Sequence, residues 1–221
     1  MTARRSAGLD SSAVADEVVS EFPLFPLGLV ALPTEAVPLH IFEERYRAMI
    51  GQCIDAETEF GIVWLSDDGL RDVGCACEVE RVLEEMEDGR FNVLTRGTRP
   101  FRVLERQGHL AFPAGVVEFL DDAAEEVDDE ALERARAVYA DLVKRATDRE
   151  PEPSELDELD AYGMAATVDF GLDAKQGLLE LRSENARLKL VTRLFRAATT
   201  RLDFVDRAQA RARSNGKVRF S

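Results

Sequence analysis

The side chains at the start of one helical segment are the first candidates for chemistry. His40, Glu43 and Glu44 lie close together, and histidine and carboxylate groups are common metal ligands. The two glutamates are neighbours in a helical pattern, so their side chains point about 100° apart. The other histidine, His109, lies far along the chain. We therefore predict structural roles for these residues and no metal site.

Two cysteines form the next candidate. Cys75 and Cys77 lie on one side of a predicted strand, where alternate residues are about 7 Å apart, which is too far for a relaxed disulfide. A zinc site would need two further ligands, and Cys53 is the only other cysteine. We predict that both thiols are small core residues. The odd number of cysteines, with an N-terminus that lacks the apolar core of a secretory signal, predicts a cytoplasmic protein.

The motifs of several enzyme classes are absent from the sequence. It has no serine in a G-x-S-x-G setting, no G-x-x-x-x-G-K-[ST] loop for nucleotide phosphates and no glycine-rich dinucleotide fingerprint after a strand. The two histidines leave few ways to build a Ser-His-Asp triad. We predict that the protein is not an enzyme, with no catalytic residue and no cofactor.

The charge of the chain restricts its partners. The formal net charge of −15 disfavours nonspecific binding to nucleic acid or to an anionic membrane. Residues 121–170 hold 17 acidic and 5 basic side chains, whereas residues 171–221 hold 5 acidic and 12 basic ones. The simplest interpretation is that these two regions pack against each other. The alternative is that the basic region binds a partner.

Three arginines at residues 96, 99 and 102 are a candidate anion-binding patch. Arg96 and Arg102 share strand parity, so their side chains would lie on one face. The alternative, which we favour, is a solvated face that pairs with the many nearby carboxylates. No basic stripe interleaved with aromatic residues occurs in this part of the sequence, which argues against nucleic-acid binding.

Residues 20–120 are predicted to fold mainly as β structure. The segment FPLFPL suggests an edge or end strand, because proline cannot donate to an interior ladder. Asp88-Gly89 between two apolar runs predicts a tight hairpin turn, and a change of phase at Val82 predicts a bulge. Six or so short strands predict a small barrel, closed or nearly closed. One amphipathic helix interrupts them, with a predicted buried stripe of Phe42, Tyr46, Met49, Ile50, Cys53 and Ile54.

Residues 121–212 are predicted to form a helical bundle. An acidic linker leads into a helix at 129–148, and further helices are predicted to begin at caps on Ser154, Asp173 and Ser183. Residues 1–19 and 213–221 are predicted to be a flexible arm and a flexible tail. The last helix has two opposite faces: an apolar one with Leu188, Val191, Leu194, Phe195, Ala198, Leu202 and Val205, and a basic one with Lys189, Arg193, Arg196, Arg207 and Arg211.

Several motifs occur in an order that resembles the N-terminal, substrate-binding domain of the Lon proteases. PLHIFEERYRAM is the most specific, and FPLFPL, FGIV and RGTRPFRVL accompany it. The likeness covers residues 21–212 and departs from the family pattern at residues 99–101 and at the two strand cysteines. It implies an α+β protein with a PUA-like barrel. Because no ATPase loop is present and no segment remains for a Ser/Lys protease site, it implies a free-standing recognition domain.

The resemblance makes a non-catalytic protein-recognition module the leading hypothesis, one that binds unfolded or exposed apolar segments of client proteins. Trp64, Leu65 and Leu70 flank a turn-rich loop, where they could anchor an extended peptide; the alternative is that Trp64 closes the end of the barrel. The second hypothesis is an adaptor that docks on a protease, a chaperone or another assembly through Arg193 and Arg196. The third is RNA binding, which PUA-like barrels often perform. The sequence leaves the oligomeric state open.

Overall fold

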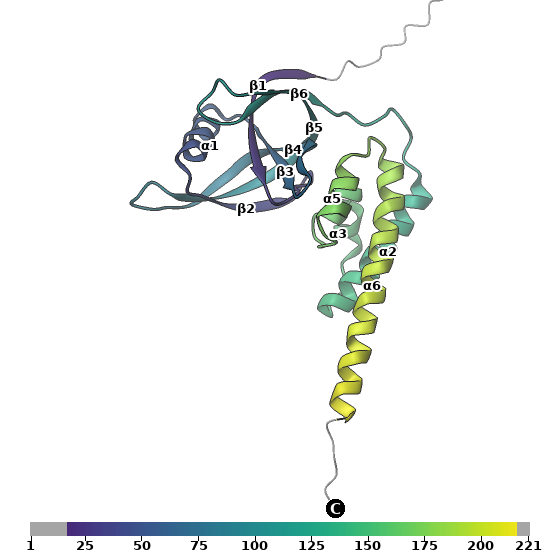
Figure 1. The fold of residues 1–221 in the computed structure, drawn as a ribbon. Helices are drawn as coiled ribbons and strands as arrows, with labels where there is room; N and C mark the ends of the chain where they lie inside the picture. The colour runs from purple at the N-terminus through teal and green to yellow at the C-terminus, as the bar shows by residue number, and fades with distance from the viewer. Residues whose placement is uncertain (1–16, 216–221) are drawn as a thin grey trace, which may run out of the picture.

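A computed structural model describes residues 17–215 of the 221-residue chain. The strands come first along the chain, with one helix among them, and the other helices follow (Figure 1). The first strand begins inside the segment predicted to be a flexible arm, and most of that arm and of the predicted tail lies outside the described residues. The elements are β1 (Val18–Leu27), β2 (Ala36–Ile41), α1 (Glu44–Ala56), β3 (Phe60–Ser66), β4 (Gly69–Glu85), β5 (Phe91–Gln107), β6 (Ala114–Phe119), α2 (Asp129–Thr147), α3 (Pro153–Asp157), α4 (Ala161–Ala165), α5 (Leu172–Leu179) and α6 (Glu184–Asn215).

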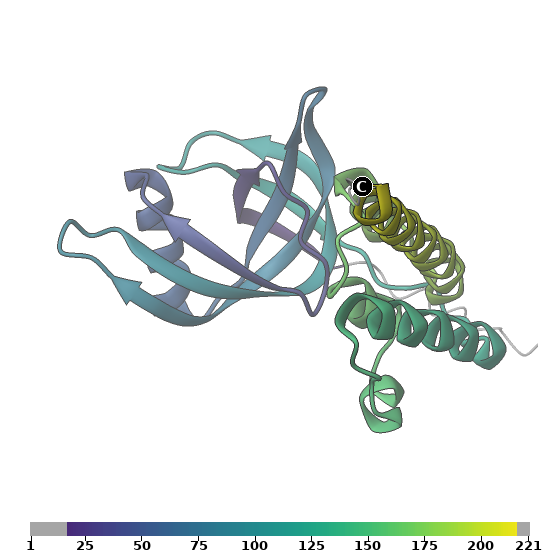
Figure 2. The same cartoon turned by 90° about the horizontal axis from the view of Figure 1, so that it is seen from below.

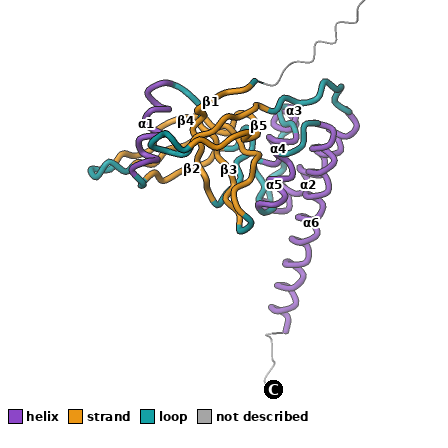
Figure 3. Tube along the Cα trace, turned by 45° about the horizontal axis from the view of Figure 1, so that its top comes forward, coloured by secondary structure: helices purple, strands orange, loops and turns teal. Residues whose placement is uncertain are grey.

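The strands close on themselves, as their number and spacing predicted. They are hydrogen-bonded in the order β2-β5-β4-β3-β1-β6, and β5 also pairs with β6. Five strands therefore form a ring, and β2 is added to β5 with its other edge unpaired. The barrel lies on one side of the molecule and helices α2 to α6 on the other (Figure 2), with α1 at the end of the barrel remote from them (Figure 3). The relation to PUA domains stays a prediction.

The prediction that the FPLFPL segment is an edge strand is wrong. Residues 18–23 of β1 pair with β6, and residues 24–27 pair in parallel with β3, so β1 lies between two strands. Each half of β1 is nevertheless paired on one side only. Proline has no backbone N–H, and at Pro23 and Pro26 that group can be absent on the side of the strand where no ladder hydrogen bond is required.

Strands β4 and β5 form a long hairpin that agrees with the local signals in the sequence. The register shifts on both sides of Val82, which confirms the predicted bulge. Gly89 has a φ of +79° and donates its N–H to the carbonyl of Met86 (2.9 Å), which confirms the turn. Arg47 of α1 donates to the carbonyl of Asp88 (3.0 Å), so the helix is tied to the hairpin tip.

Helix α1 begins later than the predicted apolar stripe. Its N-cap is Glu43, so Phe42 precedes the helix and is exposed, and its predicted place in the buried stripe is wrong. The physical reason lies in β2: Ile41 ends that strand facing the core, and the next residue of an extended chain points to the opposite face. The rest of the stripe is buried, at Tyr46, Met49, Ile50 and Cys53, with Ile54 half-buried.

Aromatic rings fill the inside of the barrel. Phe22, Phe101 and Phe119 meet edge to face, with ring centroids 5.4, 5.6 and 6.5 Å apart, a favoured geometry for aromatic pairs. Glycine is needed beside them, because a Cβ on Gly61 or Gly74 would lie 2.3 or 2.7 Å from the Phe101 ring. A second, larger cluster of buried residues continues from the barrel wall into the helical part.

Helices α2 and α6 run side by side and organise the helical part. The side chain of Asn185 accepts the backbone N–H of Asp128 at one end (2.8 Å), and Arg145 pairs with Asp203 towards the other (2.7 Å). None of the helices within residues 17–215 is long and apolar enough to cross a membrane. The predicted apolar face of α6 is buried at Leu188, Val191 and Phe195.

The predicted helix caps have different outcomes. The hydroxyl of Ser183 accepts a backbone N–H three residues on (3.0 Å), which confirms it as a cap. The helix expected to begin at Ser154 is instead two short helices, α3 and α4, and Glu152 caps the first of them. Asp173 is not a cap, because α5 begins directly after Gly171. Gly171 has a φ of +89°, a conformation that glycine adopts readily.

Helix α5 joins the helical part to the barrel. The side-chain amide of Gln176 donates to the carbonyl of Val73 in β4 (3.2 Å), and Lys175 forms a largely buried ion pair with Glu35, which precedes β2. These polar contacts fix the position of the helices against the barrel wall.

Candidate functional site

The three residues predicted to anchor a peptide lie on different faces of the β3–β4 hairpin. Trp64 is 9% exposed and belongs to the larger core cluster, with the Arg71 guanidinium 5.2 Å from its ring centroid. Leu65 points the other way and is 53% exposed. Leu70 is its cross-strand partner and is half-buried. The structure thus brings Leu65 and Leu70 together and buries Trp64 behind them.

Leu65 lines an apolar groove of about 420 Å³ on the barrel, which we call the barrel groove. Its floor is made by the buried side chains of Phe25, Ile41 and Tyr46. The ring centroids of Phe25 and Tyr46 lie 4.2 Å apart. Its walls include Pro26, Leu27 and Pro113, which come from β1 and from the segment before β6. The groove therefore gathers residues that are far apart in the sequence.

Phe42 forms the exposed rim of the barrel groove. It is 58% exposed, and its ring stacks on the ring of His40 with centroids 5.8 Å apart. Most large aromatic side chains of a folded domain are buried, and exposed apolar patches beside a groove often mark an interaction site. Phe42 and Leu65 together present two exposed apolar side chains above an aromatic floor.

The charges at the barrel groove are internally neutralised. Arg45 pairs with Glu43 (2.8 Å), and its guanidinium lies 4.5 Å from the centroid of the Tyr46 ring. Burial raises the pKa of the Tyr46 phenol above its usual value, so the floor carries no charge at neutral pH. A groove of this kind favours neutral, apolar groups over charged ones.

The unpaired edge of β2 runs past the barrel groove. Gly97 donates its N–H to the carbonyl of Glu35 (3.0 Å), and alternate residues of an antiparallel strand direct their backbone groups to the same side. Ala36, Pro38 and His40 therefore direct their backbone groups away from β5, to the free edge. Pro38 has no N–H to offer, which limits uncontrolled pairing along this edge.

His40 lies between the barrel groove and a second hollow of about 670 Å³ that also touches Pro38 and Leu83. Its Nδ1 lies 2.7 Å from Asn92 Oδ1, and the Asn92 amide donates to Glu84 (3.0 Å). His40 is therefore fixed by a row of cross-strand hydrogen bonds. The predicted structural role of this histidine agrees with that geometry.

The two strand cysteines and the three arginines singled out in the sequence have structural roles. Cys75 and Cys77 are fully buried in the core, which confirms their assignment as core residues, and burial raises the pKa of the Cys75 thiol well above its usual value. The predicted pairing of the three arginines with carboxylates is also confirmed. Their partners are Glu80 for Arg96, Glu17 and Glu59 for Arg99, and Glu118 for Arg102.

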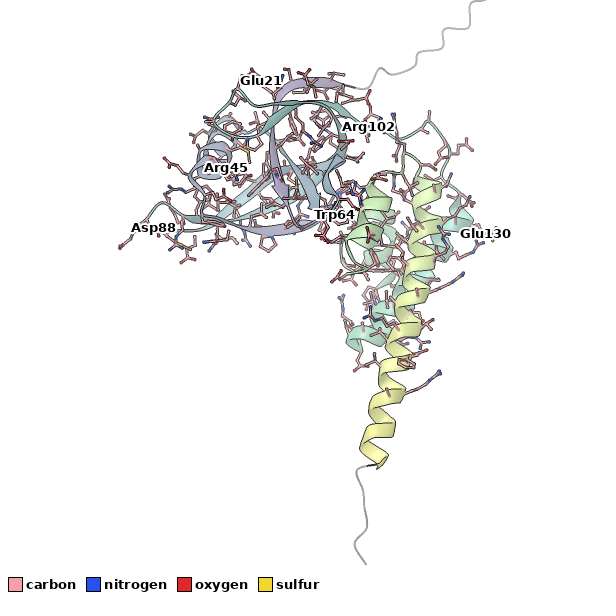
Figure 4. The ribbon with its side chains drawn as sticks, in the orientation of Figure 1. Glu21, Arg45, Trp64, Asp88, Arg102 and Glu130 are labelled. Atoms are coloured by element: carbon pink, nitrogen blue, oxygen red, sulfur yellow. The ribbon has the colours of Figure 1, made fainter. Side chains whose placement is uncertain are left out.

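Arg193 and Arg196 lie at a second groove, of about 430 Å³, between α2 and α6, which we call the helical groove. Both side chains are exposed. Arg45 at the barrel groove and Glu130 beside the helical groove lie on opposite sides of the molecule (Figure 4). The predicted site residues thus fall into two separate places.

Sequence reasoning missed Phe42, which it assigned to the core. The signal that could have found it is the alternation of β2, where Val37, Leu39 and Ile41 are the buried residues. Extending that alternation by one residue places Phe42 on the outer face. The helical spacing from Phe42 to Tyr46 obscured this, because a residue can fit the period of a helix without belonging to it.

Two curated relatives of this chain are Lon proteases. It is 27% identical over 198 residues to the Lon protease of Anaeromyxobacter dehalogenans (strain 2CP-C), a match that covers 81% of this chain and 23% of that protein. It is 26% identical over 204 residues to Lon protease 2 of Myxococcus xanthus, covering 81% and 24%. The chain therefore spans about a quarter of the length of these relatives.

Solved structures of Lon N-terminal domains share the fold. The Lon N-terminal domain protein from Xanthomonas campestris superposes with a TM-score of 0.60 at 24% identity, over 77% of this chain and 96% of that one. The N-terminal domain of the Mycobacterium avium complex Lon protease gives a TM-score of 0.59 at 17% identity, over 79% and 97%. The family model described as the ATP-dependent protease La (LON) substrate-binding domain matches residues 21–197. This chain belongs to the family of LON substrate-binding domains.

Proposed function

We propose that this protein is a non-catalytic recognition module that binds exposed apolar segments of unfolded or partly folded proteins in the barrel groove. The observation that carries the proposal is the pair of exposed apolar side chains, Phe42 and Leu65, above the buried aromatic floor. Membership of a substrate-binding family supports the general kind of partner.

The energetics of the groove suit weak, reversible capture. Fully burying a leucine or phenylalanine side chain contributes about 1.5–3 kcal/mol, and Phe42 and Leu65 are already about half covered. Each would therefore add roughly 1 kcal/mol on binding. Two such contacts do not reach the roughly 8 kcal/mol of a micromolar complex, so a client segment must gain the rest from backbone pairing and from the walls.

The free edge of β2 supplies a place for that backbone pairing. An extended segment laid along the edge could hydrogen-bond the outward groups of Ala36 and His40 and the carbonyl of Pro38. Alternate side chains of the segment would then enter the barrel groove. The acidic character of the protein favours neutral or basic segments over acidic ones.

The three residues predicted from the sequence to anchor a peptide have different roles in this proposal. Leu65 contacts the client directly, and Leu70 extends the apolar surface across the hairpin. Trp64, which is buried, holds β3 in place behind them. For this chain, delivery of the bound segment to a protease or chaperone is part of the proposal, since the curated relatives are Lon proteases.

The test is binding of a fluorescently labelled model polypeptide, in matched unfolded and folded forms, followed by anisotropy. The unfolded form should bind, and Phe42→Ser with Leu65→Ser should weaken that binding by about 30-fold, the equivalent of roughly 2 kcal/mol. The matched control is Leu104→Ser with Phe204→Ser, because these side chains are 53% and 72% exposed and lie outside the groove. Equal weakening by both pairs would refute the assigned site.

A further inference from the structure

A row of cations borders the helical groove. Lys189, Arg193 and Arg196 line it from α6, and their spacing of four and three residues places them on one face of the helix. Along the helix axis they are about 6 and 4.5 Å apart. Arg134 of α2 stands at the opposite wall. The groove is thus bordered by positive charge on both sides.

The side chains of this row have no partner among the described residues. Within residues 17–215, the side chains of Lys189, Arg193 and Arg196 form neither a hydrogen bond nor an ion pair, and all three residues are exposed. Arg134, in contrast, pairs with Glu130. Like charges at a four-residue spacing repel each other, so the row is unfavourable for the isolated helix. Its charge is open to an external anion.

A neighbouring arginine shows what internal pairing looks like in the same helix. The Arg187 side chain is 3% exposed, is held by Asp122 and Glu184, and lies 4.4 Å from the ring centroid of Tyr162. The acidic and basic regions therefore do pair, as the simplest interpretation of the sequence predicted, but they do so at Arg187. The exposed row, which begins one half-turn further along the helix, takes no part in this pairing.

The floor of the helical groove is narrow and weakly polar. Ala131 of α2 and Leu188 and Thr192 of α6 form it, and all three are buried. The hydroxyl of Thr192 is occupied by the carbonyl of Leu188 (2.7 Å). A small apolar side chain fits this floor, while acidic groups on either side would meet the cations.

We propose that the helical groove docks an acidic helical segment of a partner protein, with carboxylates about one turn apart that face Lys189, Arg193 and Arg196. The surface is independent of the barrel groove, so a docked partner leaves the client site open. An adaptor needs both surfaces.

A protein segment fits this groove better than a nucleic acid does. The linker directly before α2, residues 121–128, carries five acidic side chains and no basic one, and a long phosphate backbone would run into that charge. Aromatic side chains on which bases could stack do not line the groove. A short acidic helix can pair with the row without reaching the linker.

The experiment uses two labelled helical peptides of about 16 residues. One carries glutamate at positions i, i+4 and i+7, and the other carries glutamine there. The full-length protein should bind the glutamate peptide at least 10-fold more tightly at low salt. Equal affinity for the two peptides would overturn the proposal. Tighter binding of a duplex DNA of the same charge would also overturn it, in favour of a nucleic-acid surface.

The variants separate the row from overall charge. Arg193→Glu with Arg196→Glu should lower the affinity for the glutamate peptide at least 10-fold. The matched control is Arg81→Glu with Arg207→Glu, which changes the net charge equally at exposed cations outside the groove and should change the affinity less than two-fold. An equal loss in both pairs would contradict the assignment. If the first pair destabilises the fold, Arg193→Gln with Arg196→Gln carries the same test. Binding of the unfolded polypeptide should be unchanged in every one of these variants. The proposal for the helical groove can therefore be refuted without refuting the proposal for the barrel groove.

Discussion

The barrel groove and the helical groove differ in how their charges are treated. At the barrel groove the charge of Arg45 is cancelled by its neighbour Glu43, and the exposed side chains of Phe42 and Leu65 are apolar. At the helical groove the apolar residues are buried, and the side chains of Lys189, Arg193 and Arg196 are exposed and have no partner among the residues that the structure describes. One surface therefore offers apolar contacts and the other offers positive charge, so the two proposed partners would use different residues.

The largest effect we expect separates paired from unpaired cations within α6. Arg187→Met removes the buried cation of an ion cluster and leaves the largely buried Glu184 and the partly exposed Asp122 without their partner, which should cost about 3 kcal/mol of the free energy of unfolding. Lys189→Met, at an exposed and unpaired position, should change it by less than about 0.5 kcal/mol. Urea unfolding followed by circular dichroism measures both. A similar cost at the two positions would show that burial does not distinguish them.

Salt should weaken binding at the helical groove much more than binding at the barrel groove. Raising the salt concentration from about 0.05 to 0.5 M shortens the screening length to a few ångströms, so binding of the glutamate peptide should weaken by about 10-fold. Binding of the unfolded polypeptide should change by less than two-fold, because hydrophobic contacts do not weaken with ordinary salts. Anisotropy titrations at the two salt concentrations check this. A parallel loss at both sites would remove the distinction between them.

A smaller effect is expected at the free edge of β2. Ala36→Pro removes an outward N–H without breaking the ladder to β5, so it should weaken binding of the unfolded polypeptide by about 3-fold, the equivalent of one modest hydrogen bond. Ala36→Val changes the side chain and keeps the N–H, and it serves as the control. If the valine variant loses as much as the proline variant, the backbone of β2 does not contribute.

The smallest effect appears only at alkaline pH and compares the two tyrosines. Burial raises the pKa of Tyr162 far above its usual value and outweighs the opposing charge of Arg187; burial also raises the pKa of Tyr46. The folded protein keeps these protons while the unfolded chain releases them above about pH 10. Stability is therefore complete below pH 10 and falls as the pH rises towards the folded pKa.

Tyr162→Phe should flatten that alkaline loss more than Tyr46→Phe does, because the pKa of Tyr162 is the more strongly raised of the two. Thermal unfolding of the wild type and both variants between pH 8 and pH 11 would measure it. At pH 7 Tyr46→Phe should unfold close to the wild-type temperature, and Tyr162→Phe should be less stable by about 1 kcal/mol, because it loses the hydrogen bond that the hydroxyl donates to the Leu178 carbonyl (3.3 Å). A steeper alkaline loss in Tyr162→Phe would be the opposite of the expected sign.

Features that depend on neighbouring residues were predictable from the sequence. The hairpin turn at Gly89 and the cap at Ser183 were found because each acts within a few residues. The apolar face of α6 was found because helical periodicity is itself a local property. The cap predicted at Asp173 was wrong, because Gly171, with its positive φ, precedes the first residue of the helix.

Both grooves depend on residues that are distant in the sequence. The barrel groove joins Pro26, Phe42, Leu65 and Pro113, and no local pattern relates the first of these to the last. Phe42 was misplaced because the end of β2, and not the helix that follows, decides which way it points. The sequence left open whether Trp64 anchors a peptide or closes the end of the barrel, because hydrophobicity beside a loop does not say whether the side chain turns inward.

What the sequence by itself determined was the family, the order of strands and helices, and the presence of a basic face on the last helix, because motifs and periodicity are written in consecutive residues. Only the tertiary structure decided which strand β1 pairs with along each half, and which cations of α6 are free. Arg187 and Arg193 look alike in the sequence. They differ because the chain brings Asp122, 65 residues away, against the first, and burial with a partner is a property of the folded chain alone.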